Sequence, residues 1–407
     1  MSNFFAATEN EVKYLLSTEA VRERSARIFE LSVRGKTHFK IDIEKLDPLA
    51  ELVAENTRKN YPSLKVPLHS RWKHFQVGGI DRNRVFETRL STELKSDVEK
   101  SKARVDLTVL SVLLDAGAGT QWKYNDKESG LSVGRSEGLA LASRELFLSG
   151  ILAENPDQPL EVNASRLSSL SPDKLKTSFQ LSPENTPVGL EGRIQLLQNL
   201  GRIIAEAKVN RISDLLFSEK DFSKESKINF KEILYRLHTR LGRIWPGRLS
   251  INGQNLGDCW IYGPLGGGIE GLVPFHKLPQ WLSLSLAYPF EMLGHELKDA
   301  SYLTGLPEYR NGGLFIDGGV LVLRNSKLLA ITHAVESDFV VEWRALTVGL
   351  LDLIAPKVRK ALNKSLEEFP LGSVLEGGTW STGRMLAKNM RPSGASPIQI
   401  RSDGTVF

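Results

Sequence analysis

The chain has 407 residues, of which 41% are hydrophobic and 25% charged, and its formal net charge is +5. This balance excludes a disordered chain, because enough apolar surface is present to offset the entropy lost on ordering. No stretch reaches the roughly 18–20 apolar residues of a membrane-spanning helix, and the single Cys259 excludes an internal disulfide.

The first sixty residues predict two helices separated by a short strand. Residues 18–36 repeat apolar side chains at helical spacing, after Ser17 or Thr18 as a cap. A second helix is expected at 49–60, capped by Asp47. Residues 38–43 alternate like a strand.

The middle of the chain predicts further helices after an irregular segment. Residues 63–100 are rich in aromatic and basic side chains and predict no regular element. The helix expected at 98–117 is apolar on most sides, which is typical of a core helix. Amphipathic helices are then predicted at 135–152, 171–179, 189–207 and 230–245.

The last third predicts two long helices and most of the strands. The helices are expected at 277–293 and 340–362, the second with a kink or break at Pro356. Strands are predicted at 259–263, 313–324 and 397–407, the last a hairpin turning at Asp403-Gly404.

This order of elements predicts a mainly α fold with a few short strands. Strands and helices do not alternate, which argues against a parallel sheet. We expect one extended helical unit over residues 1–407. The serine- and proline-rich segment 164–187 is the best candidate for a sub-boundary.

Several signatures of known chemistry are absent. The sequence has no GxxxxGK[ST] loop, HExxH or paired CxxC, and its seven histidines form no HxH or HxxxH pair. We therefore expect no metal and no cofactor. The basic residues are interleaved with acids, as in 22–27 and 224–232, which is typical of solvated helix faces. We expect no nucleic-acid partner. A small molecule that carries a phosphate would be compatible with the net positive charge of the chain.

Fixed charges beside aromatic residues mark the candidate site. They gather in four places: His69, Arg71, Trp72, Lys73 and His74; Arg135, Ser136 and Glu137; His276, Lys277, Gln280 and Trp281; and Glu342, Trp343 and Arg344. Each of these groups could instead have a purely structural role. Asp317, an acid within an otherwise apolar predicted strand, is equally suited to a turn before two glycines. Glu342 and Arg344 are two residues apart and cannot face one another on a helix, so each needs its own partner if buried.

Long strings of the sequence resemble one family over nearly the whole chain. These strings are LSTEAVRERSARIFEL, PLHSRWKHF, LDAGAGTQWKY, GRSEGLALAS, GLEGRIQLL, LVPFHKLPQWL, TGLPEYRNGGLFIDGGVL, EWRALTVGLLD, VLEGGTW and IRSDGTVF. They resemble the uracil catabolism protein four family. The resemblance implies a role in a pyrimidine-degrading route in which uracil becomes a ribonucleotide, its ring is opened and urea is released.

Residues 100–350 are also similar, more distantly, to the queuosine-nucleotide N-glycosidase family. This similarity implies a helical DNA-glycosylase-like body and cleavage between a ribose 5′-phosphate and a base. The sequence departs from that family just before Pro279-Gln280, where the glycosidases place an acid and this chain has Phe275, His276 and Lys277. Their catalytic acid cannot be carried over to that site.

The two resemblances lead to the hypothesis of an N-glycoside hydrolase. It would act on a ring-opened uracil ribonucleotide such as phosphoribosylurea and release urea and ribose 5-phosphate. The chemistry needs a carboxylate, a donor for the leaving nitrogen and cations for the phosphate. The candidates are Asp317, Glu342 or Asp115 as the carboxylate; His276 or Lys277 as the donor; Arg71, His74 and Arg135 at the phosphate; Trp72 or Trp281 beside the sugar; and Glu137, Gln280 and Arg344 as further binding residues.

The alternative hypothesis is a non-catalytic partner of the ring-opening enzyme or of its labile product. A DNA-repair glycosylase is disfavoured, because it needs a basic groove for the duplex. We expect a phosphorylated ribosyl small molecule as the partner and no membrane. The N-terminus carries acids where a signal peptide is basic, so we expect a cytoplasmic protein. The oligomeric state is left open.

Overall fold

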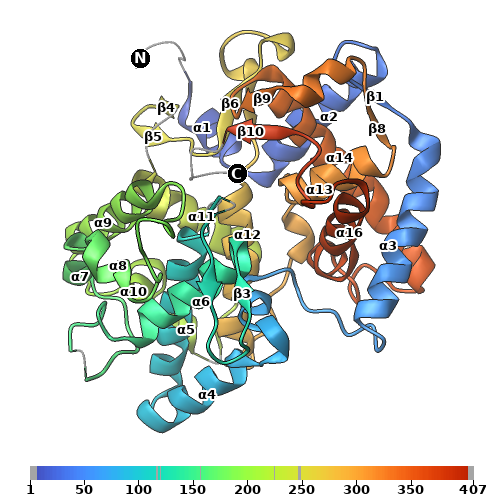
Figure 1. Cartoon of the computed structure of the whole chain (residues 1–407). Coiled ribbons are helices and arrows are strands. Elements are labelled where there is room, and N and C mark those ends of the chain that lie inside the picture. Colours follow the sequence, from blue (N-terminus) through green and yellow to red (C-terminus); the bar gives the residue numbers. More distant parts are fainter. Residues whose placement is uncertain are drawn as a thin grey trace. The chain divides into compact units, whose positions relative to one another are not determined.

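The computed structural model describes residues 7–115, 118–119, 121–155, 157–223, 225–245 and 249–401. Over these residues the fold is mainly α-helical with a few short strands, as predicted (Figure 1). Within the described ranges, no helix combines the length and apolar character needed to cross a membrane.

The chain divides into two compact units, each built from separate segments. Among the described residues, unit 1 comprises those of 7–69, 249–281 and 299–401, and unit 2 those of 70–245 and 282–298. Helix α12 (Lys277–Glu291) contributes its first residues to unit 1 and the others to unit 2. The segment 164–187 lies inside unit 2. Whether the two units act as one body stays a prediction.

Unit 1 is built around the long helix α14. Its helices are α1 (Glu9–Leu15), α2 (Thr18–Val33), α3 (Leu46–Asn60), α13 (Tyr309–Asp317), α14 (Asp338–Leu362), α15 (Leu371–Val374) and α16 (Trp380–Met390). Helix α14 packs against α2 and α3, and α16 packs against α13 and α3. Figure 1 shows the early helix α3 beside the late helix α16. Helix α14 continues unbroken through Pro356.

The strands of unit 1 form four two-stranded sheets. They are β1 (Phe39–Ile41), β4 (Ser250–Ile251), β5 (Gln254–Asn255), β6 (Cys259–Ile261), β7 (Leu272–Pro274), β8 (Leu321–Leu323), β9 (Thr332–Ala334) and β10 (Gln399–Arg401). The pairs β1–β8, β4–β5 and β6–β7 are antiparallel, and β9–β10 is parallel. The predicted turn at Asp403-Gly404 lies outside the described residues.

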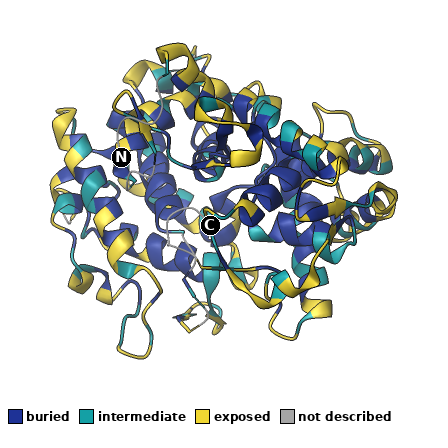
Figure 2. Cartoon of the chain, turned by 90° about the horizontal axis from the view of Figure 1, so that it is seen from above, coloured by how far each residue is buried: buried dark blue, intermediate teal, exposed yellow. Residues whose placement is uncertain are grey.

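Unit 2 surrounds the buried helix α5. Its elements are α4 (Arg82–Glu93), α5 (Asp97–Leu113), β2 (Tyr124–Asn125), β3 (Ser132–Val133), α6 (Arg135–Leu148), α7 (Ala164–Ser168), α8 (Pro172–Lys176), α9 (Leu190–Glu206), α10 (Ile212–Leu216), α11 (Phe230–Leu241) and the later part of α12. Every residue of α5 from Ser101 to Leu113 is buried, as its all-round apolar pattern predicts. In Figure 2 the buried residues lie on the inner faces of the helices and the exposed ones on the outer faces.

Three local predictions were wrong, each for a reason visible in the structure. Residues 82–93 form α4, because Asp81 caps it by accepting from the backbone amides of Asn83 and Arg84. Asp47 does not cap α3; it lies in the first turn and pairs with Lys357 of α14. Residues 313–317 belong to α13 and not to a strand, and only 321–323 form β8.

A π-helical turn, Leu375–Thr379, separates α15 from α16 and packs closely on α3. A Cβ atom at Gly378 would lie 2.7 Å from Oγ1 of Thr57 and closer still to Val53. Such contacts force side chains or backbone to shift. Only glycine fits here, which explains the Gly-Gly pair at 377–378.

We expect Gly378→Ala to lower the free energy of unfolding by about 1–3 kcal/mol through overpacking. The matched control is Gly192→Ala on the exposed face of α9, where the new Cβ meets no described atom within 4 Å. That change should be neutral or stabilise by up to about 1 kcal/mol. Guanidinium denaturation of both variants makes the comparison, and equal effects would contradict the close packing.

Candidate functional site

In unit 1 a buried ion pair between Arg344 and Asp258 binds two backbone segments, one at Lys277 and one at Pro307. The two terminal guanidinium nitrogens of Arg344 donate to the two carboxylate oxygens of Asp258, at 2.7 and 2.8 Å. Two backbone groups also bind the pair. The amide of Lys277, at the start of α12, donates to Asp258 at 3.0 Å, and Nε of Arg344 donates to the carbonyl of Pro307 at 3.3 Å. The pair therefore holds Lys277 and the residue before Glu308.

Electrostatics keep this pair ionised. Burial opposes ionisation of Asp258, but Arg344 outweighs it and holds the pKa of the carboxyl well below its usual range. The indole of Trp260 donates to the same carboxylate at 2.7 Å, and the Arg344 guanidinium lies 4.2 Å from the ring centre of Phe275. A buried carboxylate that accepts from Arg344, Trp260 and Lys277 is held in one ionised position.

Glu308 is a buried carboxylate at the start of α13. It is the N-cap of α13 and accepts from the amides of Arg310 and Asn311 at 2.7 and 2.6 Å. Only 8% of the residue is exposed. Burial raises the pKa of Glu308, although the two amides and the nearby charges of Lys277 and His69 act to lower it. A carboxyl with a raised pKa is suited to general acid–base work near neutral pH.

The two basic residues that act on Glu308, Lys277 and His69, lie beside indole rings. The ammonium of Lys277 lies 5.7 Å from the ring centre of Trp281. The imidazole of His69 lies 6.3 Å from Trp281 and 6.2 Å from Trp380, between centroids. We call these five residues, with Glu376, the Glu308 cluster.

The π-helical turn supplies the partner of His69. Glu376 lies in this turn, and its carboxylate contacts Nδ1 of His69 at 2.8 Å and accepts from the hydroxyl of Tyr61 at 2.8 Å. A carboxylate on one ring nitrogen orients the imidazole. The π-helical turn that requires glycine at Gly378 therefore also positions Glu376 against His69. Such turns are frequent at functional sites.

Of the predicted residues of unit 1, Lys277 and Trp281 lie in the Glu308 cluster. Gln280 and Arg344 support it. Gln280 is buried and holds the segment before Glu308, because its amide oxygen accepts from the backbone of Thr304 at 2.7 Å and its amide nitrogen donates to the hydroxyl of Thr304 at 2.9 Å.

The other predicted residues of unit 1 are bound to other partners. His276 is fully buried, its Nε2 contacts the carbonyl of Leu15 at 2.7 Å, and burial lowers its pKa. Asp317 ends α13 and forms two hydrogen bonds with Arg391, one of 2.9 Å. Glu342 accepts from His38 and from Tyr262, each at 2.8 Å. Glu342 and Arg344 thus have separate partners, as predicted.

The remaining predicted residues belong to unit 2. Arg71 is buried and pairs with Asp115 at 3.0 Å, and burial lowers its pKa against the opposing charges of Asp115 and Glu137. Trp72 packs on Tyr288 with centroids 4.1 Å apart, so its indole belongs to the core. His74 is buried and Arg135 is half-buried at the first position of α6. The binding roles of these residues stay predictions.

The sequence singled out His69 with its neighbours but gave it no role, and it did not point to Glu308, Asp258, Glu376 or Trp380. One signal was available for Glu308: an acid after Pro307 and before a helical segment is a capping position. Glu376 and Trp380 lie inside the string VLEGGTW, whose paired glycines indicate a close backbone approach. Asp258 gave no signal, because its partner Arg344 lies far along the chain.

The cluster combines a buried carboxyl, an ammonium, an oriented imidazole and two indole faces. This set can transfer protons to and from a bound molecule and pack against a flat or cyclic group. Among the described residues, no group of three or more His, Cys, Asp or Glu side chains is placed to hold a metal ion.

A family model described as "Protein of unknown function (DUF1688)" matches residues 14–407. The chain belongs to this family. Among curated relatives, Protein urg3 of Schizosaccharomyces pombe is 40% identical, over 98% of this chain and all of the relative. Uracil catabolism protein 4 of Lachancea kluyveri is 36% identical, over 98% of this chain and 99% of the relative. The family match confirms the resemblance found in the sequence and extends over both units.

Proposed function

We propose that this protein acts in uracil catabolism as an N-glycoside hydrolase. Its substrate would be a ring-opened uracil ribonucleotide such as phosphoribosylurea. Water adds to C1′, the bond between C1′ and the urea nitrogen breaks, and the products are urea and ribose 5-phosphate. The printed name of the Lachancea kluyveri relative supports the pathway.

The observation that carries the proposal is the environment of Glu308. Cleavage of an N-glycosidic bond develops positive charge at the sugar, and a nearby carboxylate stabilises that charge and takes a proton from water. Burial raises the pKa of Glu308, which makes its carboxylate a stronger base than an ordinary glutamate. Asp317 and Glu342, the carboxylates favoured from the sequence, are bound instead by Arg391 and by His38 and Tyr262.

Lys277 is the candidate donor to the leaving group in this scheme. The departing urea nitrogen needs a proton, and an ammonium electrostatically coupled to Glu308 can supply it. Trp281 and Trp380 offer flat faces for the sugar or the ureido group.

The direct test is incubation of the purified chain with phosphoribosylurea, with urea and ribose 5-phosphate measured separately. We expect the two products in equal amounts, and slower turnover of the non-phosphorylated ribosylurea. Binding of phosphoribosylurea without any urea release would contradict the proposal and favour the non-catalytic partner.

A further inference from the structure

Unit 2 contains a cavity of about 260 Å³ beside helix α6. Its lining comes from the start of α4, from β2 and the turn after it, from the middle of α6 and from the segment after α8. The charged and hydroxyl-bearing residues that the inference uses are Arg82, Tyr124, Asp126, Glu128, Arg144 and Glu145. The cavity is somewhat smaller than the roughly 300–1,000 Å³ of pockets for drug-sized ligands.

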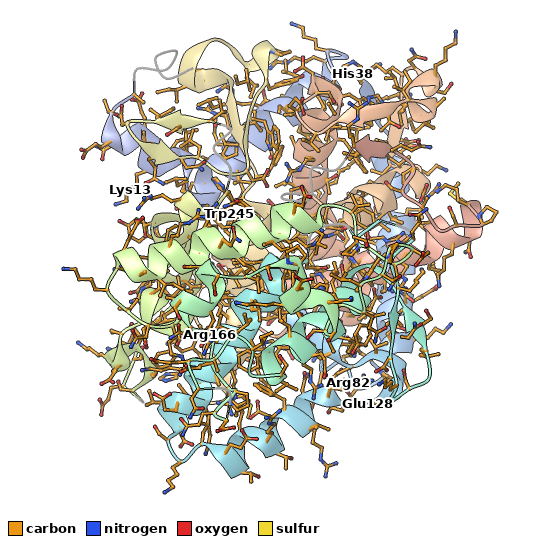
Figure 3. All side chains as sticks on the ribbon, turned by 60° about the vertical axis from the view of Figure 1, so that its left-hand side comes forward. Lys13, His38, Arg82, Glu128, Arg166 and Trp245 are labelled. Atoms are coloured by element: carbon orange, nitrogen blue, oxygen red, sulfur yellow. The ribbon has the colours of Figure 1, made fainter. Side chains whose placement is uncertain are left out.

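One of the two buried arginines of this cavity is fully paired. Arg82 donates to Asp126 at 2.5 Å, and its Nε lies 3.0 Å from Glu128. Figure 3 labels Arg82 and Glu128 next to each other at one edge of the unit. Asp126 and Glu128 are therefore occupied by Arg82.

The second arginine, Arg144, is not paired. Only 7% of the residue is exposed, and its Nε has no hydrogen-bond partner among the described residues. Unlike Arg82, Arg144 forms no ion pair with a carboxylate of the described chain. Burial lowers its pKa, and the charges of Glu128 and Glu145 only partly oppose this. A buried charge without a counter-ion is costly, and an anion that binds beside it removes that cost.

We propose that this cavity is a binding site for a small carboxylate, whose oxygens accept hydrogen bonds from Arg144. Tyr124 supplies a second donor at the cavity wall, because burial first and then Glu145 raise its pKa to about 12 and keep the hydroxyl protonated. The single positive charge of Arg144 is balanced by one bound carboxylate, which carries one negative charge. The nearby acids Glu128 and Glu145 disfavour a doubly charged phosphate. The site is independent of the proposed hydrolysis, because none of its lining residues belongs to the Glu308 cluster.

The test is the unfolding temperature of the whole chain in the presence of acetate, inorganic phosphate or neutral acetamide, at fixed ionic strength. We expect acetate to raise the transition of the wild type by about 2–4 °C at saturating concentration. Phosphate should raise it less, and acetamide should not raise it.

Arg144→Gln should abolish the response to acetate. Without acetate this variant should be as stable as the wild type or more stable, because it removes an uncompensated buried charge. The control is Arg202→Gln, the same change on the exposed face of α9, which should keep the full acetate response. As a second readout, the Nε–H signal of Arg144 in an ¹⁵N spectrum of the wild type should shift with acetate.

Three results would overturn the proposal. They are no effect of acetate on the wild type, an equal effect of acetate on Arg144→Gln, or a larger effect of phosphate than of acetate. The last would assign the cavity to a different ligand.

Discussion

Glu308→Gln should reduce the turnover of phosphoribosylurea by about 10²–10⁴-fold while the protein remains folded. Glutamine keeps one oxygen for the amides of Arg310 and Asn311 but cannot take a proton from water. The loss of one capping interaction should lower stability by only about 1 kcal/mol. Urea release under saturating substrate measures the effect, and a thermal melt confirms the fold.

The matched comparison is Glu342→Gln, a second buried glutamate of unit 1. Its carboxylate is bound by His38 and Tyr262, so we expect a loss of stability with turnover largely kept. If Glu342→Gln lost turnover and Glu308→Gln did not, the assignment would be reversed.

The pH dependence of the wild type gives an independent check of Glu308. The base must be ionised to act, and burial raises its pKa. The acid limb of kcat/KM should therefore fall at a pH above the ordinary range of a glutamate, and it should be absent from the residual activity of Glu308→Gln.

Arg344→Met should lower the free energy of unfolding by about 3–5 kcal/mol at pH 7, because it leaves the carboxylate of Asp258 buried and unpaired. It also releases the carbonyl of Pro307, so turnover should fall as well. The double variant Asp258→Asn/Arg344→Met should lose less stability than Arg344→Met alone, since no unpaired charge remains. A double variant as unstable as the sum of the two single variants would contradict the pairing.

The effect of Arg344→Met should depend on pH in a defined direction. The folded-state pKa of Asp258 is depressed, so its pair stabilises the wild type above the pKa of an unfolded aspartate, about 4. That stabilisation is lost as the pH falls further, toward the depressed pKa. The difference between wild type and variant should thus be largest near neutral pH and shrink below about pH 4.

The helices that the sequence predicted well are those defined by local pattern. Helices α2, α5, α9 and α11 repeat apolar residues at the helical period. Helices α2, α5 and α11 are also capped by the adjacent side chains of Ser17, Ser96 and Asn229. Helix α13 was predicted as a strand because its glycines and apolar run resemble one. Its Gly312 is explained only by a distant partner, since a Cβ there would lie 2.6 Å from the ring of Trp343.

Part of the candidate site was also predictable from local sequence patterns. Lys277 and Trp281 were identified because aromatic and basic residues at a helix start stand out in a sequence. The raised pKa of Glu308 depends on burial, and the roles of Asp258 and Arg344 depend on their pairing across the fold. A local stretch of sequence reveals neither burial nor pairing between distant residues. The only local signal for Glu308 is its position at the start of a helical segment, where it caps α13.

The division of unit 1 into separate segments has a consequence for how the chain reaches its folded state. Residue Phe39 of β1 pairs with Leu323 of β8, and α3 packs on α14 and α16. During synthesis, the first three helices therefore emerge long before the partners that cover their apolar faces. Such late closure slows folding and leaves early segments exposed to misfolding and proteolysis. We expect truncation before α14 to leave unit 1 unfolded, since its N-terminal helices then lack the core that joins them.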